Sequence, residues 1–177
     1  ISEGPENDDD KSGPAIGAFV SEGVDVIGSP AWNAVGLDGR GVKAGIIDQF
    51  GGYRALMGIE LPLEENVTIR SFARHGEIFH PDFEELLQDH GTNVGEIIYD
   101  IAPRASHHLA YIETAVEFQR AINWLIDEEV NVINTSLGFE SACYRGGGIF
   151  EPVLEHAKSQ SVSWATSAGN EAASFLQ

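Results

Sequence analysis

This sequence has few cysteines, few lysines and no long apolar run, and each of these absences excludes a structural feature or a class of protein. Cys143 is the only cysteine, so no disulfide can form within the chain. The cysteine content therefore does not indicate whether the protein functions in an oxidising or a reducing compartment. No apolar run reaches the roughly 18 residues that span a bilayer. No signal peptide is visible, but the sequence begins at Ile1 and its only methionine is Met57, so secretion is not excluded.

Basic residues are also few, because 10 lysines and arginines face 28 acidic residues and give a net charge of -18. Such a surface repels nucleic acids and anionic membranes, so neither is predicted as a partner. The same composition is typical of halophile proteins, which acidic residues keep soluble at high ionic strength. That is one hypothesis, and an acidic protein without salt adaptation is the other.

Residues 1–17 are acidic and are interrupted by glycine and proline, which predicts a disordered linker. Residues 18–177 are sufficient for one domain with a hydrophobic core. In this part, strand and helix patterns alternate. Short apolar runs predict strands at residues 42–47, 67–72, 109–112, 130–134 and 162–165.

Helices are predicted between these strands. A Ser-Pro start predicts a helix at residues 31–35, and apolar periodicity predicts one at 91–101. Thr114 and Glu117 form a capping box that opens a third helix, and Pro152 lies in the first turn of a fourth, at 151–158. The third helix is expected to bury Phe118, Ala121, Ile122, Leu125 and Ile126. The alternation predicts a three-layer α/β/α fold with a mainly parallel sheet.

Polar residues follow three of the predicted strands, and in parallel sheets such strand ends share one edge. Asp48 could accept a hydrogen bond from a histidine ring, although a turn or cap aspartate is the simpler interpretation. Ser136, Leu137 and Gly138 could expose a backbone edge to an extended peptide, or form an ordinary strand exit. The Asn170 amide could donate to a developing oxyanion, or simply lie in a turn.

His90 opens the helix at residues 91–101, where a neutral imidazole could take a proton from a hydroxyl group and return it to a leaving amine. A helix-capping or metal-binding histidine is the alternative. The metal hypothesis would use His75, His80, Asp82, Asp89 and His90, but their spacings match no compact zinc pattern.

Five segments, in this order, resemble the subtilase family of subtilisin-like serine peptidases. They are GIID (45–48), HGTNVGEI (90–97), IAP (101–103), VINTSLG (132–138) and SAGN (167–170). The resemblance implies a serine endopeptidase acting on polypeptides, in which Asp48 orients His90 and His90 serves as general base and then general acid. It further implies that Asn170 supplies an oxyanion donor. Ser136, Leu137 and Gly138 would line the substrate channel.

The sequence departs from the family pattern in three places. The G-T-S-x-[AS] segment that carries the nucleophilic serine is missing and is expected beyond Gln177. We therefore expect the N-terminal part of a catalytic domain, at residues 18–177, with a fold incomplete at its C-terminus and no activity in isolation. Gln49 replaces the usual threonine or serine after the aspartate, and Gly95 replaces the usual alanine after the histidine motif.

Other functions remain as alternatives. A subtilase-like pseudoenzyme would bind peptides without cleaving them. Ser167 lies in ATSAG, which is close to the G-x-S-x-G elbow of α/β-hydrolases, but no acid and histidine follow it in the required order. Asp48 could be a phospho-acceptor in a signalling domain, yet a phosphate-binding glycine loop is missing from the sequence. A lone Cys143 is more often a structural residue than a nucleophile.

The resemblance also implies a secreted or extracellular protein. The chemistry requires no cofactor and no metal. Structural calcium is common in the family, but no calcium motif can be matched to named residues here.

Overall fold

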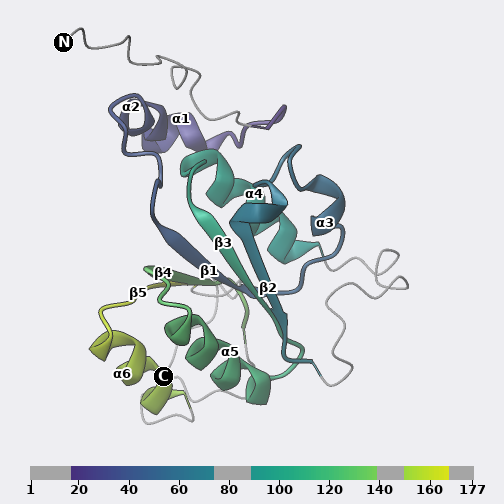
Figure 1. Ribbon diagram of the computed structural model, residues 1–177, viewed down its shortest axis with the longest axis vertical. Helices are drawn as coiled ribbons and strands as arrows, with labels where there is room; N and C mark the ends of the chain where they lie inside the picture. The colour runs from purple at the N-terminus through teal and green to yellow at the C-terminus, as the bar shows by residue number, and fades with distance from the viewer. Residues whose placement is uncertain (1–16, 74–88, 139–149, 168–177) are drawn as a thin grey trace, which may run out of the picture.

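The computed structural model describes residues 17–73, 89–138 and 150–167. Within them, five strands form one sheet with the spatial order β2-β3-β1-β4-β5, and every neighbouring pair is parallel (Figure 1). The strands are β1 (Lys43–Asp48), β2 (Val67–Ser71), β3 (Ser106–Tyr111), β4 (Val132–Thr135) and β5 (Ser163–Thr166). All five strands were predicted, and the largest boundary change is in β3, which begins at Ser106 instead of Leu109.

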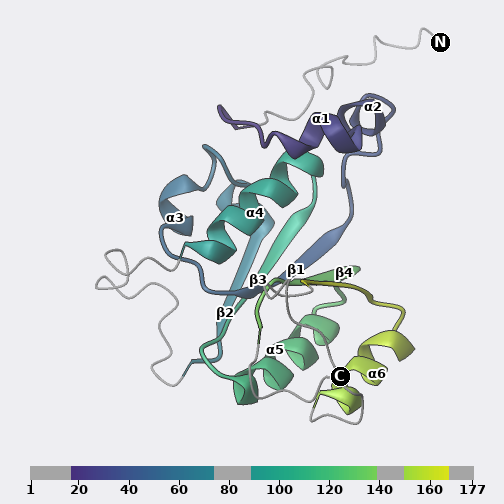
Figure 2. The same ribbon diagram turned by 180° about the vertical axis from the view of Figure 1, so that it is seen from behind.

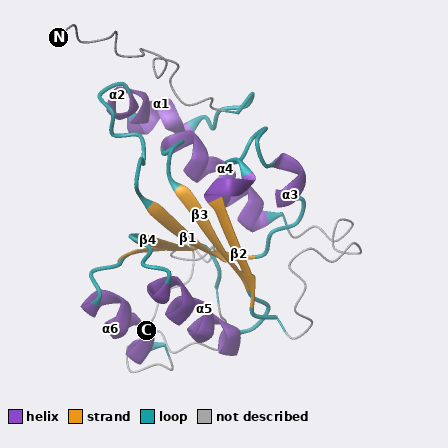
Figure 3. Ribbon diagram, in the orientation of Figure 1, coloured by secondary structure: helices purple, strands orange, loops and turns teal. Residues whose placement is uncertain are grey.

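Helices cover both faces of the sheet. One face carries α1 (Gly23–Ile27), α3 (Tyr53–Leu56) and α4 (His90–Ile101), and the opposite face carries α5 (Ala115–Asp127) and α6 (Glu151–Ser159) (Figures 2 and 3). The short α2 (Ser29–Asn33) follows α1, and a 3-10 turn, η1 (Glu64–Asn66), precedes β2. The predicted α/β/α layering is therefore present.

Alternation along the central strands supplies a hydrophobic core to each face, because successive strand residues point to opposite sides. Ile46 and Leu109 pack with Phe50 and Tyr53 under α4. Their neighbours, including Ile47, pack in a second cluster under α5 and α6. Strands buried on both faces explain the continuous apolar run of β1.

The predicted capping box at the start of α5 is present, with the Glu117 carboxylate accepting the N–H of Thr114 at 3.0 Å. The buried face of α5 is wider than predicted. It includes Trp124 in addition to the expected residues, whereas Ile126 is only partly buried. The difference arises because Trp124 covers β3 from the side of the helix that the apolar periodicity leaves out.

The far end of α4 is tied to the chain that precedes α1. The backbone N–H and the hydroxyl of Ser21 both donate to one carboxylate oxygen of Asp100, at 2.8 and 2.6 Å. Asp100 is buried in the last turn of α4. This contact joins residues 79 positions apart and fixes the C-terminal end of the helix.

None of the helices in the described part of the chain has the length and apolar character needed to cross a lipid bilayer.

Candidate active site

The structure brings Asp48 and His90 together at the carboxyl edge of the sheet. The Nδ1 atom of His90 lies 2.9 Å from Oδ2 of Asp48, within hydrogen-bonding distance. Asp48 is the last residue of β1, and His90 is the first residue of α4. The Asp48 side chain is fully buried, whereas the His90 side chain is 55% exposed. A buried carboxylate thus supports an imidazole that solvent or a substrate can reach.

The environment of Asp48 leaves little room for any other role. Its second oxygen, Oδ1, accepts the backbone N–H of Gln49 at 2.8 Å. Burial raises the pKa of Asp48, while the Gln49 amide and the neighbouring His90 oppose that change. Because both carboxylate oxygens are engaged and none of the side chain reaches solvent, the phospho-acceptor hypothesis has no accessible group to act on.

Gly91 and Thr92 explain how α4 comes so close to β1. The Gly91 N–H donates to the Gln49 carbonyl at 2.9 Å, and the Thr92 hydroxyl donates to the Gly51 carbonyl at 2.7 Å. A Cβ atom on Gly91 would lie 2.5 Å from Cβ of Asp48 and 2.6 Å from the Gln49 oxygen. Only glycine therefore allows the helix to dock at this point. In the H-G-T sequence, His90 supplies the imidazole, and Gly91 and Thr92 make the contacts that hold α4 against the end of β1.

Gly95, one turn further along α4, makes room for a buried aromatic ring. A Cβ atom there would lie 2.9 Å from the Tyr53 ring. The Tyr53 hydroxyl shares a 2.7 Å hydrogen bond with Nδ1 of His107, which is fully buried in β3. Glycine at position 95 thus has a steric cause in this chain. The Tyr53–His107 pair itself was not predicted from the sequence.

His107 is held neutral in this core. Burial, together with the nearby His108, lowers the pKa of His107 to about 4. Burial of Tyr53 raises the pKa of its hydroxyl, so both partners stay uncharged at neutral pH. The Nε2 atom of His107 is buried and has no partner among the described residues. The pair supports the α4 face of the sheet and does not reach the exposed edge where His90 lies.

Ser136, Leu137 and Gly138 follow β4, which pairs with β1 in the register Ile47 to Thr135. Ser136 donates its hydroxyl to the Asn134 side chain at 3.1 Å, and Leu137 is partly buried against the core under α5. Gly138 is exposed, with open space where a Cβ atom would be. These residues therefore leave the sheet at the same edge as Asp48. That is the position in which an extended peptide could lie beside them.

Several predicted residues lie outside the described part of the chain. They are His75, His80, Asp82, Cys143 and Asn170. Among the described residues, no group of three or more histidines, cysteines or carboxylates is placed to hold a metal ion. The oxyanion role of Asn170 stays a prediction.

Ser167, the candidate for a hydrolase elbow, directly follows β5 and keeps a backbone hydrogen bond to β4. Its N–H donates to the Thr135 carbonyl at 3.1 Å, which continues the β4–β5 pairing one residue beyond β5. An elbow serine requires a sharp turn at the nucleophile itself. This backbone contact therefore weakens the elbow hypothesis.

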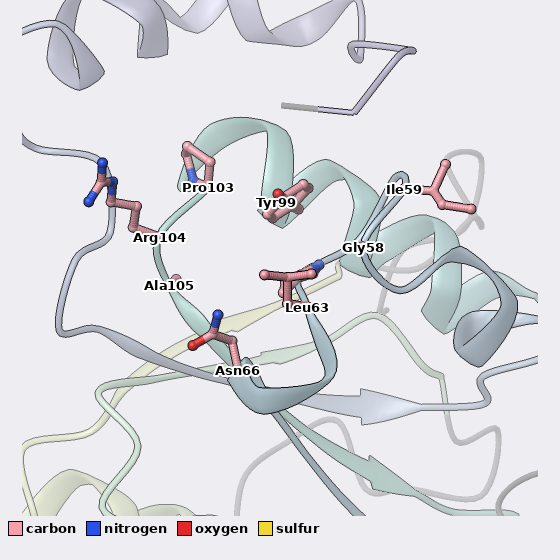
Figure 4. A pocket seen from close by; sticks show the side chains of 9 residues that line it. Gly58, Ile59, Leu63, Asn66, Tyr99, Pro103, Arg104 and Ala105 are labelled. Carbon is pink, nitrogen blue, oxygen red and sulfur yellow. The ribbon is translucent and has the colours of Figure 1, made fainter. Parts of the chain in front are cut away.

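A hollow lies at the amino edge of the sheet, opposite the carboxyl edge that holds Asp48 and His90 (Figure 4). It encloses about 270 Å³ between Asn66, which precedes β2, and Ala105, which precedes β3. Tyr99 and Arg104 also line it. Because parallel strands place their two ends at opposite edges, this hollow is separated from Asp48 by the length of the strands.

Comparisons with known proteins reveal similarity in fold alone. No family model and no curated protein matches the sequence. Among solved structures, the prenylagaramide maturation protease PagA matches with a TM-score of 0.58 and 16% identity, over 81% of this chain and 51% of that one. A mutant of the protease domain of PatA matches with a TM-score of 0.52 and 18% identity. The self-cleaved PatA protease domain matches with a TM-score of 0.51 and 17% identity.

The two PatA structures are matched over 76% of this chain and 52% of theirs, so the chain spans about half the length of all three solved structures. Identities this low carry information about the fold only. The comparison confirms the predicted α/β fold, which this chain shares with these solved protease structures.

Proposed function

We propose that this chain carries the acid–histidine half of a subtilisin-like serine endopeptidase. The single observation behind the proposal is the 2.9 Å hydrogen bond between buried Asp48 and exposed His90 at the carboxyl edge of the parallel sheet. The fold shared with the protease domains of PagA and PatA supports the same function. The nucleophilic serine would come from a segment outside the printed sequence.

In the proposed reaction, Nδ1 of His90 keeps its proton on the side of Asp48, which leaves Nε2 free to act as a base. Nε2 takes the proton of the serine hydroxyl while the serine oxygen attacks the peptide carbonyl carbon. The same proton then passes to the leaving nitrogen as the C–N bond breaks, and an acyl-enzyme forms. Water, activated by Nε2, releases the acyl group.

The polypeptide substrate would lie along Ser136, Leu137 and Gly138 and bind through main-chain hydrogen bonds. Asn170 would donate to the developing oxyanion, a contribution worth about 3–4 kcal/mol where measured in such enzymes. No step requires a metal or an organic cofactor. A structural calcium ion is compatible with this proposal, and no described residue is assigned to it.

Labelling with a fluorophosphonate probe tests the proposal. We expect no labelling of the 177-residue chain, and stoichiometric labelling of an extended protein that also carries the proposed serine segment. His90→Ala in the extended protein should abolish labelling, whereas Lys158→Gln on α6 should not. Labelling that survives His90→Ala would contradict the assigned role of the imidazole.

A second candidate is a subtilase-like pseudoenzyme that binds peptides without cleaving them. The exposed Gly138 at the β4 exit supports peptide binding with or without cleavage. The extended protein would then bind peptides but take up no fluorophosphonate.

A further inference from the structure

A hollow lies at the carboxyl edge of the sheet two strands away from Asp48, on the side away from β4. It encloses about 830 Å³ and is lined by Ser71, Phe72, Ala73, Glu113, Thr114, Val116, Glu117 and Arg120. It opens where β2 and β3 end and α5 begins, which is the carboxyl edge of the sheet. The sequence analysis did not anticipate it.

The strand register fixes the location of this hollow relative to the catalytic pair. Asp48 pairs with Tyr111, and Tyr111 pairs with Ser71, so the three residues lie in a row across β1, β3 and β2. Two strand spacings separate Asp48 from Ser71, which is about 10 Å. An extended peptide advances about 3.4 Å per residue. A substrate side chain about three residues from the peptide bond cleaved next to His90 would therefore reach the hollow.

The floor and the rim of the hollow differ in character. Phe72, Ala73 and Glu117 form a floor that is more than nine-tenths buried. Glu113 and Arg120 are exposed at the rim. The Ser71 hydroxyl oxygen is buried and has no hydrogen-bond partner among the described residues.

The acidic groups of the lining are already engaged. The Glu117 carboxylate accepts the N–H groups of Glu113 and Thr114, at 2.7 and 3.0 Å, and so closes the amino end of α5. Glu113 accepts the Tyr111 hydroxyl at 3.4 Å. Burial of Tyr111, together with the negative charge of the neighbouring Glu113, raises the pKa of the Tyr111 hydroxyl to about 12.

Arg120 is the cation of this hollow, and it forms no ion pair within the part of the chain that the structure describes. Its guanidinium carbon lies 5.8 Å from the centroid of the Phe72 ring. Arg70 approaches the same ring at 5.2 Å. Two guanidinium groups therefore lie against one buried aromatic ring, and Arg120 is the one that lines the hollow, together with Glu113 and Glu117.

From this arrangement we infer that the hollow is a specificity pocket for an acidic side chain of the polypeptide substrate, with Arg120 as the group that binds its carboxylate. The inference rests on the proposed peptidase function, since it requires a peptide along the carboxyl edge. Phe72 packs against the methylene groups of that side chain. Arg120 acts here as a specificity-determining residue.

The protein's overall charge makes the test discriminating, because a net charge of -18 opposes non-specific binding of acidic peptides. The probes are fluorescein-labelled octapeptides of alanine and glycine, each with a single glutamate at one of the eight positions. Matched sets carry glutamine or lysine instead. Binding to the 177-residue chain is measured by fluorescence anisotropy. Amide exchange at Gly138 reports independently whether peptides occupy the β4 exit.

We expect glutamate at one register to bind about tenfold more tightly than glutamine at the same position, as for a charge-assisted hydrogen bond. Arg120→Gln should remove the preference, and Arg120→Glu should transfer it to the lysine set. Lys158→Gln makes the same charge change on exposed α6 and should leave the preference intact. Arg120 is exposed, so circular dichroism should show the fold retained in its variants.

Equal binding of the three sets, with Gly138 protected from exchange, would overturn the acidic pocket and leave the proposed function standing. A lysine preference that Glu113→Gln removes would also overturn it, since Glu113 would then be the recognition group. The absence of binding by every peptide, with Gly138 unprotected, would overturn both the pocket and the proposed peptide site.

Discussion

The Nδ1 atom of His90 lies 2.9 Å from the Oδ2 atom of Asp48, although the two residues are 42 positions apart in the sequence. The contact joins the end of a buried strand to the start of a helix. An ionised carboxylate only accepts hydrogen bonds, so the neutral imidazole must carry its proton on Nδ1. The pairing therefore selects one of the two imidazole tautomers.

Asp48→Asn should disturb this selection. An amide can present either its oxygen or its NH₂ group to Nδ1, so the Nδ1–H tautomer is no longer enforced. ¹⁵N NMR of the histidine rings in the 177-residue chain should show Nε2 unprotonated in the native protein and a mixed population in the variant. In the extended protein, the same change should lower kcat by about 10⁴-fold. An unchanged tautomer population would contradict the orienting role.

Gly91→Ala should weaken the docking of α4. The new Cβ would lie within 2.6 Å of Asp48 and of the Gln49 carbonyl, and the backbone oxygen cannot rotate away. We expect a loss of about 1–3 kcal/mol in the free energy of unfolding, measured in urea. Gly23→Ala is the matched control, because nothing lies within 4 Å of that position. Equal effects of the two changes would argue against close packing at Gly91.

Gly95 and Tyr53 should be energetically coupled. Gly95→Ala alone places a Cβ 2.9 Å from the Tyr53 ring and should cost about 1–3 kcal/mol of stability. In a Tyr53→Leu background the clash is removed, so the same substitution should cost less. A double-mutant cycle in urea gives the coupling energy. Additive effects would mean that the ring and the helix backbone do not compete for space.

The buried His107 should make the fold sensitive to acid. Its pKa is lowered to about 4 in the folded protein, against 6.5 when exposed, so the unfolded chain binds more protons between these values. The free energy of unfolding should then rise with pH from about 4 to 6.5, by up to about 3 kcal/mol, and be lost on acidification. His108, whose pKa burial also lowers, acts in the same direction.

His107→Asn tests the origin of this pH dependence, because asparagine can still accept the Tyr53 hydroxyl but does not titrate. Urea unfolding of both proteins across pH 4–7 should give a shallower slope for the variant. A slope identical to that of the native chain would assign the acid sensitivity to other groups.

The net charge of -18 predicts a dependence on salt. Screening weakens repulsion among exposed carboxylates, so melting temperature should rise between 10 mM and 1 M KCl. A further rise into the multimolar range would support the halophile hypothesis. Greater stability at low salt would count against it.

Patterns local in the sequence predicted most of the fold. The strands and the four predicted helices could be recognised because each has an apolar run, a periodic face or a cap, as Thr114 and Glu117 show for α5. The short α1 and α3 were missed, since helices of four or five residues have too little sequence for a periodic pattern. The start of β3 was not recognised, because Ser106, His107 and His108 are polar and precede the apolar run that was used to predict the strand.

The candidate site was predictable only in part. Asp48 and His90 were selected from their positions at element ends, and no local pattern could give their distance. Gly91 and Gly95 looked alike in the sequence, yet one contacts Asp48 and the other Tyr53. The pocket at Ser71 and Arg120 depends on which strands become neighbours, a property of the sheet order that periodicity does not contain.

Helix α4 is attached at both ends, through Gly91 and Thr92 to the β1 exit and through Asp100 to Ser21. A helix anchored in this way cannot slide along its axis or rotate without breaking contacts at one end. The imidazole of His90 is therefore preorganised, and the entropy of aligning it is lost when the chain folds rather than when a ligand arrives. Loosening either anchor should change the reactivity of His90 even though its own contacts are untouched.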